Sequence, residues 1–255
     1  MKGATISVIR RFLPGVVSML GFMLLWQLGT SFGPLSGGSL PSAINAISAL
    51  GALFVLPEIW LAIGQTLFIA LTGLLISVVL GIPAGVLVGL SPFAYRSLKP
   101  VLDFFKVIPP IVIIPIVILV FGPTTEMGIF LVVFANFFML VFQSAYGVRD
   151  LDTVLLDTLR CYGMTKWDEI WHARIPGALP FIAVGVRIAV AASMIVAVVA
   201  GLIGGAPSLG QQMLLYQSSG QPNQTFAIVI IFGVLGLGLA RIYSRLQRKI
   251  VFWTD

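Results

Sequence analysis

Long apolar stretches, separated by short polar segments, follow one another along almost the whole chain. Because a helix of about 20 apolar residues crosses the hydrocarbon core of a bilayer, each stretch is a candidate transmembrane helix. The pattern predicts an all-α integral membrane protein in which a single domain, 1–255, contains six transmembrane helices. We place these spans at 12–32, 62–90, 107–122, 127–147, 178–202 and 225–243.

The composition supports this interpretation. Hydrophobic residues make up 58% of the chain and charged residues 9%, with a mean hydropathy of +1.07, a balance that excludes an ordinary soluble domain. The apolar run after Arg10 and Arg11 resembles a secretory signal peptide, but it is long and lacks a small-x-small cleavage site, so we expect it to be retained. The single Cys161 excludes an intrachain disulfide, and one Cys with one His provides no metal site.

The basic residues lie almost entirely on one side of the predicted spans. Fourteen of the fifteen Lys and Arg residues fall in the N-terminal segment, from the end of the sixth span onward, or in the segments after the second and fourth spans. Because Lys and Arg near helix ends are retained in the cytoplasm, both termini are expected there. The net charge of +6 is thus explained by topology, and a nucleic-acid partner has no support.

Arg187, the fifteenth basic residue, falls inside the fifth predicted span. An ionisable group inside a membrane is costly and is often functional. Two interpretations stay open: the Arg187 side chain extends to the cytoplasmic interface, or it contacts the transported solute.

The cytoplasmic segment 148–180 has the pattern of two short helices joined by a turn. Gly163 can adopt the left-handed conformation that ends a helix. Thr165 can then cap the next helix, with Asp168 at its third position.

Trp167, Ile170 and Trp171 form an apolar stripe on the second of these helices, which faces the cytoplasm. Such a stripe needs a partner surface, and periodicity alone leaves the partner open. The hairpin docks on another protein, packs beneath its own helix bundle, or lies in the lipid interface, where Trp is common.

The same segment resembles the signature loop of ABC importer permeases, in which E-A-A is followed by three residues, a glycine and a later motif of the I-x-L-P type. Asp157-Thr158-Leu159 occupies the E-A-A position, Gly163 the glycine, and Ile175-Pro176 with Leu179-Pro180 the end of the motif. In that family the loop docks into a cleft on an ATPase subunit. The resemblance implies that ATPase coupling involves Asp157, Thr158, Leu159, Gly163, Thr165, Trp167, Ile170, Trp171 and Pro176.

Further motifs resemble the nitrate, sulfonate and taurine branch of these permeases over nearly the whole chain. This resemblance implies the type I ABC importer permease fold with cytoplasmic coupling helices, in the inner membrane of a prokaryote. The solute would be a small organic or inorganic anion such as a sulfonate, taurine or nitrate, with a pyrimidine or vitamin-like compound as the alternative. The motifs are Leu40-Pro41-Ser42, Gly81-Ile82-Pro83-Ala84-Gly85, Gly89-Leu90-Ser91-Pro92, Ile108-Pro109-Pro110, Ile114-Pro115 and Phe121-Gly122.

The chain also departs from the family pattern. Asp157 replaces the usual Glu, Thr158 and Leu159 replace the two alanines, and Gly201 stands where many relatives carry an acidic residue. These changes leave the strength of ATPase docking open. They also permit a second permease that is either identical to this chain or homologous to it.

Small and polar residues within the spans have packing or transport roles. Gly81, Gly85 and Gly89 recur at four-residue intervals, which allows a neighbouring helix to approach closely. Asn136 and Gln143 share one helix face, and both are candidates to border the translocation path. An interhelical hydrogen bond is the alternative explanation for each polar residue. The candidate path residues are Gln65, Asn136, Gln143, Arg187 and Ser193.

The polar stretch 204–212 faces the outside and resembles the short helical hairpin that caps the path in relatives. The resemblance implies that an extracytoplasmic solute-binding protein docks there, with Ser208, Gln211 and Gln212 as contact residues.

The chain has no glycine-rich phosphate loop that ends in Gly-Lys-Ser/Thr, and it has no acidic cluster for magnesium. We therefore expect a permease subunit that is not an enzyme and holds no cofactor or metal, with ATP and magnesium bound by a separate ATPase. The family implies two ATPase subunits, a second permease and the binding protein as partners, in contact with membrane lipid.

A self-contained secondary transporter driven by an ion gradient fits the hydropathy equally well. Such transporters use intramembrane carboxylates and often contain internal repeats. None of the predicted spans contains Asp or Glu, and no repeat is apparent in the sequence. A channel or a structural scaffold needs no coupling loop, so the sequence favours an ATP-driven importer.

Overall fold

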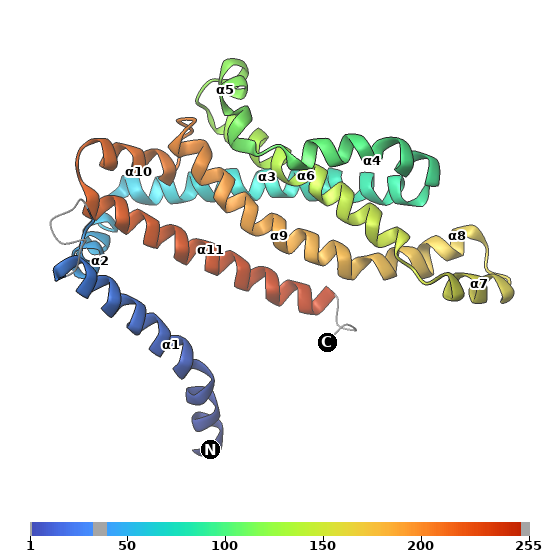
Figure 1. Ribbon diagram of the computed structural model, residues 1–255, viewed down its shortest axis with the longest axis horizontal. Coiled ribbons are helices and arrows are strands. Elements are labelled where there is room, and N and C mark those ends of the chain that lie inside the picture. The colour runs from blue at the N-terminus through green and yellow to red at the C-terminus, as the bar shows by residue number, and fades with distance from the viewer. Residues whose placement is uncertain (1, 33–39, 251–255) are drawn as a thin grey trace. The chain divides into compact units, whose positions relative to one another are not determined.

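The computed structural model describes residues 2–32 and 40–250, with only the backbone described at 2–13, 16 and 250. Within these ranges every regular element is a helix, which confirms the all-α class (Figure 1). In chain order the elements are α1 (Lys2–Ser31), α2 (Ala43–Leu53), α3 (Pro57–Leu90), α4 (Pro92–Val107), α5 (Pro110–Phe121), α6 (Thr125–Arg149), α7 (Thr153–Cys161), α8 (Lys166–Glu169), η1 (Ile170–Arg174), α9 (Ile175–Leu202), α10 (Leu209–Ser218) and α11 (Pro222–Ile250).

The chain divides into two compact units. The first contains Met1–Pro57 and Met213–Phe232, and so includes α1, α2, the end of α10 and the start of α11. The second contains Glu58–Gln212 and Gly233–Asp255, and so includes α4 to α9 and almost all of α3. The predicted coupling and path residues all belong to the second unit.

Among the described residues, four helices are long and apolar enough to cross a membrane. The bent pair α4 and α5 makes a fifth span if it is counted as one. The predicted first span lies in α1, whose described apolar stretch, Val17–Ser31, is shorter than a span. The structure therefore confirms a multi-pass protein but not the count of six. The four helices are Pro57–Leu90, Thr125–Arg149, Lys166–Leu202 and Pro222–Lys249, which cover the predicted spans at 62–90, 127–147, 178–202 and 225–243.

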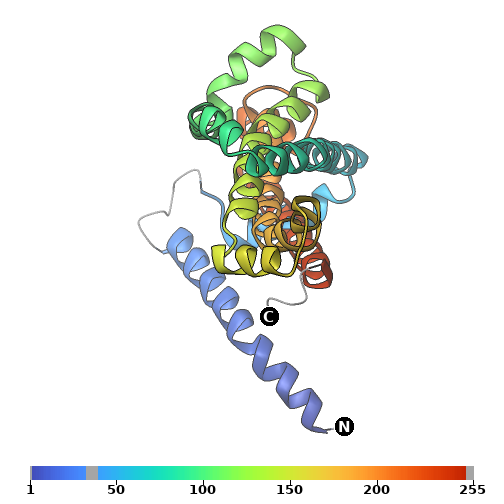
Figure 2. The ribbon, with the colours of Figure 1, turned by 90° about the vertical axis from the view of Figure 1, so that its right-hand side faces the viewer.

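The predicted third span, 107–122, is not one straight helix. The chain bends by 88° between α4 and α5 (Figure 1 and Figure 2). Ile108 and Pro109 both have extended backbone angles, because proline disfavours the helical conformation in the residue before it and cannot donate a backbone hydrogen bond. The 12 residues of α5 extend only about 18 Å, which is less than the roughly 30 Å of the hydrocarbon core.

The helices α6 and α9 pack closely at the centre of the second unit. A Cβ atom added to Gly147 on α6 would lie 2.8 Å from Cβ of Phe181, and one added to Gly185 on α9 would lie 2.9 Å from Cγ of Gln143. Val148, Ala178 and other residues of both helices form part of the buried core. Glycine on each helix thus allows this close packing.

The glycine spacing on α3 has the predicted effect. A Cβ atom at Gly85 would lie 2.5 Å from the carbonyl oxygen of Val141, and one at Gly89 would lie 2.7 Å from that of Ala145. At Gly81 the nearest atom would be Cβ of Leu140, at 3.2 Å. The helix that approaches is α6, so the prediction of close packing is confirmed.

In the first unit, the Leu40-Pro41-Ser42 motif connects α1 with α2. The Ser42 hydroxyl caps α2 by accepting a hydrogen bond of 3.3 Å from the amide of Asn45. Trp26 on α1 donates from Nε1 to the carbonyl oxygen of Pro41 at 3.1 Å. Three basic residues of the N-terminal segment support the predicted cytoplasmic N-terminus, but their side chains lie outside the described part of the chain. They are Lys2, Arg10 and Arg11.

Candidate functional site

The first arm of the predicted hairpin is α7. The carboxylate of Asp152 caps its start by accepting a hydrogen bond of 2.8 Å from the amide of Val154. The helix ends at Gly163, which has a φ of +79°. The amide of Gly163 donates to Arg160 O at 2.9 Å, and that of Met164 to Leu159 O at 3.2 Å, which is the bonding of a left-handed helix end. The predicted role of Gly163 in ending the helix is confirmed.

The predicted cap of the second arm is also present. The Thr165 hydroxyl accepts a hydrogen bond of 3.2 Å from the amide of Asp168, and Asp168 Oδ2 accepts one of 3.1 Å from the amide of Thr165. This reciprocal pair is a capping box. Hydrogen bonds from the hydroxyl and amide of Thr165 hold the pKa of the Asp168 carboxyl below its usual value.

The second arm is not the separate short helix that the sequence predicts. After the four residues of α8, the chain forms the π-turn η1 and continues directly into α9. The resulting helix, Lys166–Leu202, has 37 residues and is about 55 Å long. Because the hydrocarbon core is only about 30 Å thick, this arm is the protruding end of a membrane-spanning helix (Figure 1).

The protruding end presents two exposed indole rings. Trp167 and Trp171 are 65% and 52% exposed, and their ring centroids are 5.8 Å apart in an edge-to-face arrangement. Ile170, the third residue of the predicted stripe, is half-buried. On α7, Leu156 is buried, whereas Val154 is exposed. Two exposed tryptophans on one short segment are typical of a protein or membrane contact surface.

Glu169 is a central residue of the hairpin that the sequence analysis missed. Its side chain is 7% exposed and forms ion pairs with Arg160 of α7 and Arg174 of η1. Burial by itself raises the pKa of Glu169, but the hydrogen bonds and charges of Arg174 and Arg160 outweigh this and hold it below the usual value. Segment 148–180 holds five acidic and four basic residues, and this mixture of charges was the available clue to ion pairs.

Two of the predicted path residues form a buried pair. Asn136 Nδ2 of α6 donates a hydrogen bond of 2.8 Å to Ser193 Oγ of α9, which in turn donates to the carbonyl oxygen of Ala189 at 2.7 Å. Asn136 Oδ1 has no hydrogen-bond partner within the described residues. This geometry fits the interhelical hydrogen bond that was the alternative to a role in the path. Gln65, on α3, is half-buried.

Arg187 is exposed and is bonded to α11. Its Nε and Nη2 atoms donate to Oε1 of Gln247 at 2.9 Å and 2.6 Å. If the last 20 or so residues of the long α9 helix cross the core, Arg187 lies within the first two turns of the crossing segment, on the side of the α7 and α8 hairpin. The position therefore favours a side chain at that membrane interface over one in contact with solute.

The segment between α9 and α10 packs tightly against the end of α9. A Cβ atom at Gly201 would lie 1.8 Å from Oγ of Ser208, and one at Gly210 would lie 2.1 Å from the carbonyl oxygen of Val198. The Ser208 side chain is 1% exposed, so its predicted contact with a binding protein does not fit this structure. Gln211 and Gln212 are half-buried.

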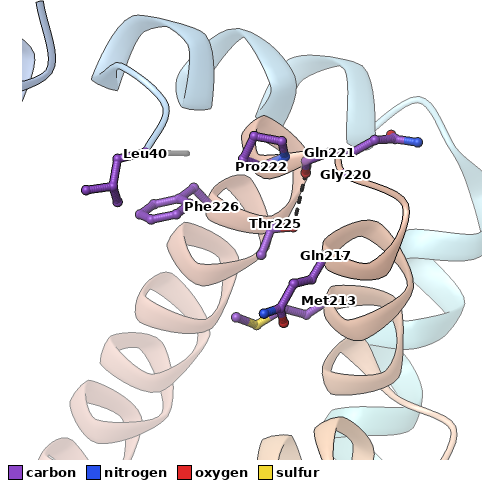
Figure 3. A pocket seen from close by; sticks show the side chains of 8 residues that line it. All are labelled: Leu40, Met213, Gln217, Gly220, Gln221, Pro222, Thr225 and Phe226. Atoms are coloured by element: carbon purple, nitrogen blue, oxygen red, sulfur yellow. Dashed lines mark hydrogen bonds between the residues drawn. The ribbon is translucent and has the colours of Figure 1, made fainter. Parts of the chain in front are cut away.

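A hollow of about 630 Å³ lies in the first unit, between the end of α10 and the start of α11. Figure 3 shows the side chains of Met213 and Gln217 on α10 opposite Thr225 on α11. No sequence pattern predicts this hollow, because its walls come from two helix ends and from the segment before α2. The lining residues are Leu40, Met213, Gln217, Gly220, Gln221, Pro222, Thr225 and Phe226.

Comparison with known proteins agrees with this architecture. Residues 81–252 match the family described as binding-protein-dependent transport system inner membrane component. The putative aliphatic sulfonates transport permease protein SsuC of Escherichia coli (strain K12) is 30% identical over 231 residues, which cover 91% of this chain and 88% of that protein. Its namesake in Bacillus subtilis (strain 168) is 27% identical over 243 residues, which cover 95% of this chain and 86% of that protein.

A similar fold occurs in a solved structure, that of the MetNI methionine ABC transporter in an inward-facing conformation. One of its chains superposes with a TM-score of 0.65 at 20% sequence identity, and the match covers 76% of this chain and 98% of that chain. The similarity supports the permease fold.

Proposed function

This chain belongs to the family of binding-protein-dependent transport system inner membrane components, the permease subunits of ABC importers, and we propose that its α7 and α8 hairpin couples solute import to a separate ATPase. The observation that carries the proposal is the continuity of the hairpin with α9. A displacement of the exposed end around Trp167 and Trp171 is transmitted along one helix, about 55 Å long, into the membrane.

The coupling surface combines rigid geometry with exposed apolar groups. The Asp152 cap, the Gly163 helix end and the Thr165 capping box fix the shape of the hairpin before any partner binds. A preformed surface binds with less loss of conformational entropy than a flexible one. The two exposed indole rings are the apolar anchors for an ATPase cleft.

ATP and magnesium are bound by the partner ATPase in this proposal. The complete importer contains two ATPase subunits, a second permease and an extracytoplasmic solute-binding protein. Both termini and the hairpin face the cytoplasm, because the basic residues gather in the segments on that side. The family description itself supports dependence on a binding protein.

The solute is a small anion of the alkanesulfonate class. Two relatives that match more than nine-tenths of the chain are described as aliphatic sulfonate permeases. A small anion also agrees with the spans predicted from the sequence, which contain polar amides such as Gln143 but no Asp or Glu.

The test is transport by the reconstituted complex. The tagged chain is purified from its native membranes together with its bound ATPase, inserted into proteoliposomes and supplied with the binding protein and a radiolabelled alkanesulfonate. We expect uptake that requires ATP hydrolysis. Uptake that proceeds on an ion gradient without the ATPase would overturn the proposal.

A further inference from the structure

A continuous series of charged contacts crosses the hairpin from its exposed tip to the end of α6. Asp157, 70% exposed, pairs with Arg160 Nη1 at 3.0 Å. Arg160 pairs with Glu169, and Glu169 pairs with Arg174. Arg174 Nη1 then donates to the carbonyl oxygen of Val148 at 3.4 Å. The series thus connects α7, η1 and α6.

Glu169 bonds both arms of the hairpin directly, Arg160 on α7 and Arg174 on η1. Its Oε2 atom accepts from Arg160 Nε at 3.3 Å and Nη2 at 3.2 Å. Its Oε1 atom accepts from Arg174 Nε at 2.7 Å and Nη2 at 2.5 Å. Each carboxylate oxygen therefore faces two nitrogens of one guanidinium group, and hydrogen bonds between charged partners of this kind are stronger than neutral ones.

The π-turn makes this geometry possible. Glu169 and Arg174 are five residues apart, a separation at which side chains on a regular α-helix point about 140° apart around the axis. In η1 the amide of Ile175 donates to the carbonyl oxygen of Ile170, which widens this turn. The wider turn brings Arg174 onto the same face as Glu169, and π-turns of this kind are frequent at functional sites.

The inner end of the series is anchored in packed core. Val148 is fully buried and forms a cluster with Ala178 and Ile182 of α9. A Cβ atom at Gly177 of α9 would lie 2.7 Å from Cδ2 of Leu151, just after α6. A displacement at Arg174 therefore acts on a rigid contact between α6 and α9.

We infer that Glu169 is the positioning residue of the coupling hairpin, which fixes α7 to the protruding end of α9 so that both arms move as one body when the ATPase moves. This inference rests on the proposed function, since it assigns the means by which the docked surface drives α9. It adds a residue outside the E-A-A and glycine positions, which belong to α7 and the turn.

Glu169 matters more than the ion pair of Asp157 with Arg160 because Glu169 is buried. The contact of Asp157 with Arg160 is exposed on both sides, and exposed ion pairs contribute little. Glu169 is buried, and removal of one partner from a buried pair leaves the other charges uncompensated. Loss of the Glu169 charge thus releases Arg160, and with it α7, from the end of α9.

The first experiment compares Glu169→Gln with the wild-type chain in the complete transporter. Uptake of an alkanesulfonate and hydrolysis of ATP are measured in the same proteoliposomes. We expect solute moved per ATP hydrolysed to fall at least about tenfold, while the ATPase still co-purifies. The matched control is Asp103→Asn, which removes a half-buried carboxylate that bridges Lys99 and Lys106 on α4 and leaves the ratio unchanged.

Arg160→Gln keeps the inference testable if Glu169→Gln fails to fold. Arg160 is 56% exposed, so its loss spares the core, and the pair of Glu169 with Arg174 remains. We expect the same loss of uptake per ATP. A ratio equal to that of the wild type in Arg160→Gln, or in a folded Glu169→Gln, overturns the inference.

The second experiment measures the geometry directly. Spin labels are attached at Thr153→Cys on α7 and His172→Cys on η1, in a Cys161→Ser background. We expect one narrow distance distribution in the otherwise wild-type hairpin and in Asp103→Asn, and a broad one in Glu169→Gln and Arg160→Gln. Narrow distributions in all four overturn the inference. Absence of ATP-driven uptake in the wild type would contradict the proposed function instead. Because the distance measurement needs no transport, it tests the role of Glu169 separately from the proposed function.

Discussion

Asn136 Nδ2 donates a hydrogen bond of 2.8 Å to Ser193 Oγ, which joins α6 to α9 in a fully buried position. Ser193→Ala leaves the Asn136 amide unpaired, at a cost of about 1–3 kcal/mol. We expect a lower unfolding temperature of the purified chain in detergent. We also expect an unchanged preference between two alkanesulfonates of different length, because neither side chain reaches the surface.

The double variant Asn136→Leu with Ser193→Ala is the control for this pair. It replaces both polar partners by apolar groups, so we expect most of the lost stability to return. An altered solute preference in either variant would show that the pair borders the path, as the sequence pattern suggested.

A side chain at Gly163 strains the end of α7. Gly163 has a φ of +79°, and an added Cβ atom would meet no atom within 4 Å, so the effect comes from the backbone alone. The left-handed conformation costs a residue with a side chain about 1–2 kcal/mol. We expect Gly163→Val to weaken ATPase co-purification more than Gly163→Ala does. Gly51→Ala, on a helix with equally open space, is the control and should leave ATPase binding unchanged.

A charge at Trp167 tests the docking surface without disturbing the core. The side chain is 65% exposed, so Trp167→Glu should leave the unfolding temperature of the isolated chain within a few degrees of the wild type. Loss of an aromatic anchor and burial of a charge against the partner should reduce ATPase affinity by about 2 kcal/mol or more. Trp167→Phe is the conservative comparison. Stoichiometric ATPase binding and full stimulation in Trp167→Glu would contradict the proposed docking.

The start of α10 should not tolerate a side chain at Gly210. A Cβ atom there would lie 2.1 Å from the carbonyl oxygen of Val198, a backbone atom that cannot move aside cheaply. We expect Gly210→Ala to destabilise the chain by about 1–3 kcal/mol, measured as a lower unfolding temperature. Gly233→Ala, on a helix with no atom within 4 Å of the added carbon, should be neutral or slightly stabilising.

The hairpin should lose stability in acid through Glu169. Burial raises the pKa of Glu169, but Arg174 and Arg160 together hold it below the usual value. The folded chain thus binds this proton more weakly than the unfolded chain, whose Glu pKa is about 4.3. The resulting stabilisation is complete above about pH 5 and is lost as the pH falls through the folded pKa. The protection factors of the α7 and α8 amides, which are intrinsic exchange rates divided by the observed rates at each pH, should therefore fall in that window.

Glu169→Gln is the reference for this measurement. The variant lacks the titrating carboxyl. The difference in protection factor between wild type and variant should therefore shrink as the pH falls below about 4. A difference that stays constant from pH 7 to pH 3 would contradict the assigned pKa direction.

Local sequence rules predicted the parts of the hairpin that depend on neighbours in the chain. Gly163 ends a helix and Thr165 with Asp168 begins one because these bonds join residues that are three to five positions apart. The glycine positions on α3 were predictable for the same reason, since four-residue spacing places them on one helix face.

The remaining features depend on departures from regular helical geometry. The bend at Ile108 and Pro109 lies at the start of the predicted span 107–122 and leaves α5 with only 12 residues. The π-turn moves Arg174 beside Glu169, although regular periodicity separates them. The burial of Ser208 follows from a long-range contact with Gly201. Contacts of this kind arise only when the tertiary packing is known.

The central claim is that motion of the hairpin on an ATPase drives solute across the membrane. The most direct test is uptake of a radiolabelled alkanesulfonate into proteoliposomes that contain the complete transporter and its binding protein, with and without Glu169→Gln. The account predicts ATP-dependent uptake in the wild type, and continued ATP hydrolysis with at least about tenfold less uptake per ATP in the variant. Equal uptake per ATP in both, or uptake in the wild type without ATP, would contradict it.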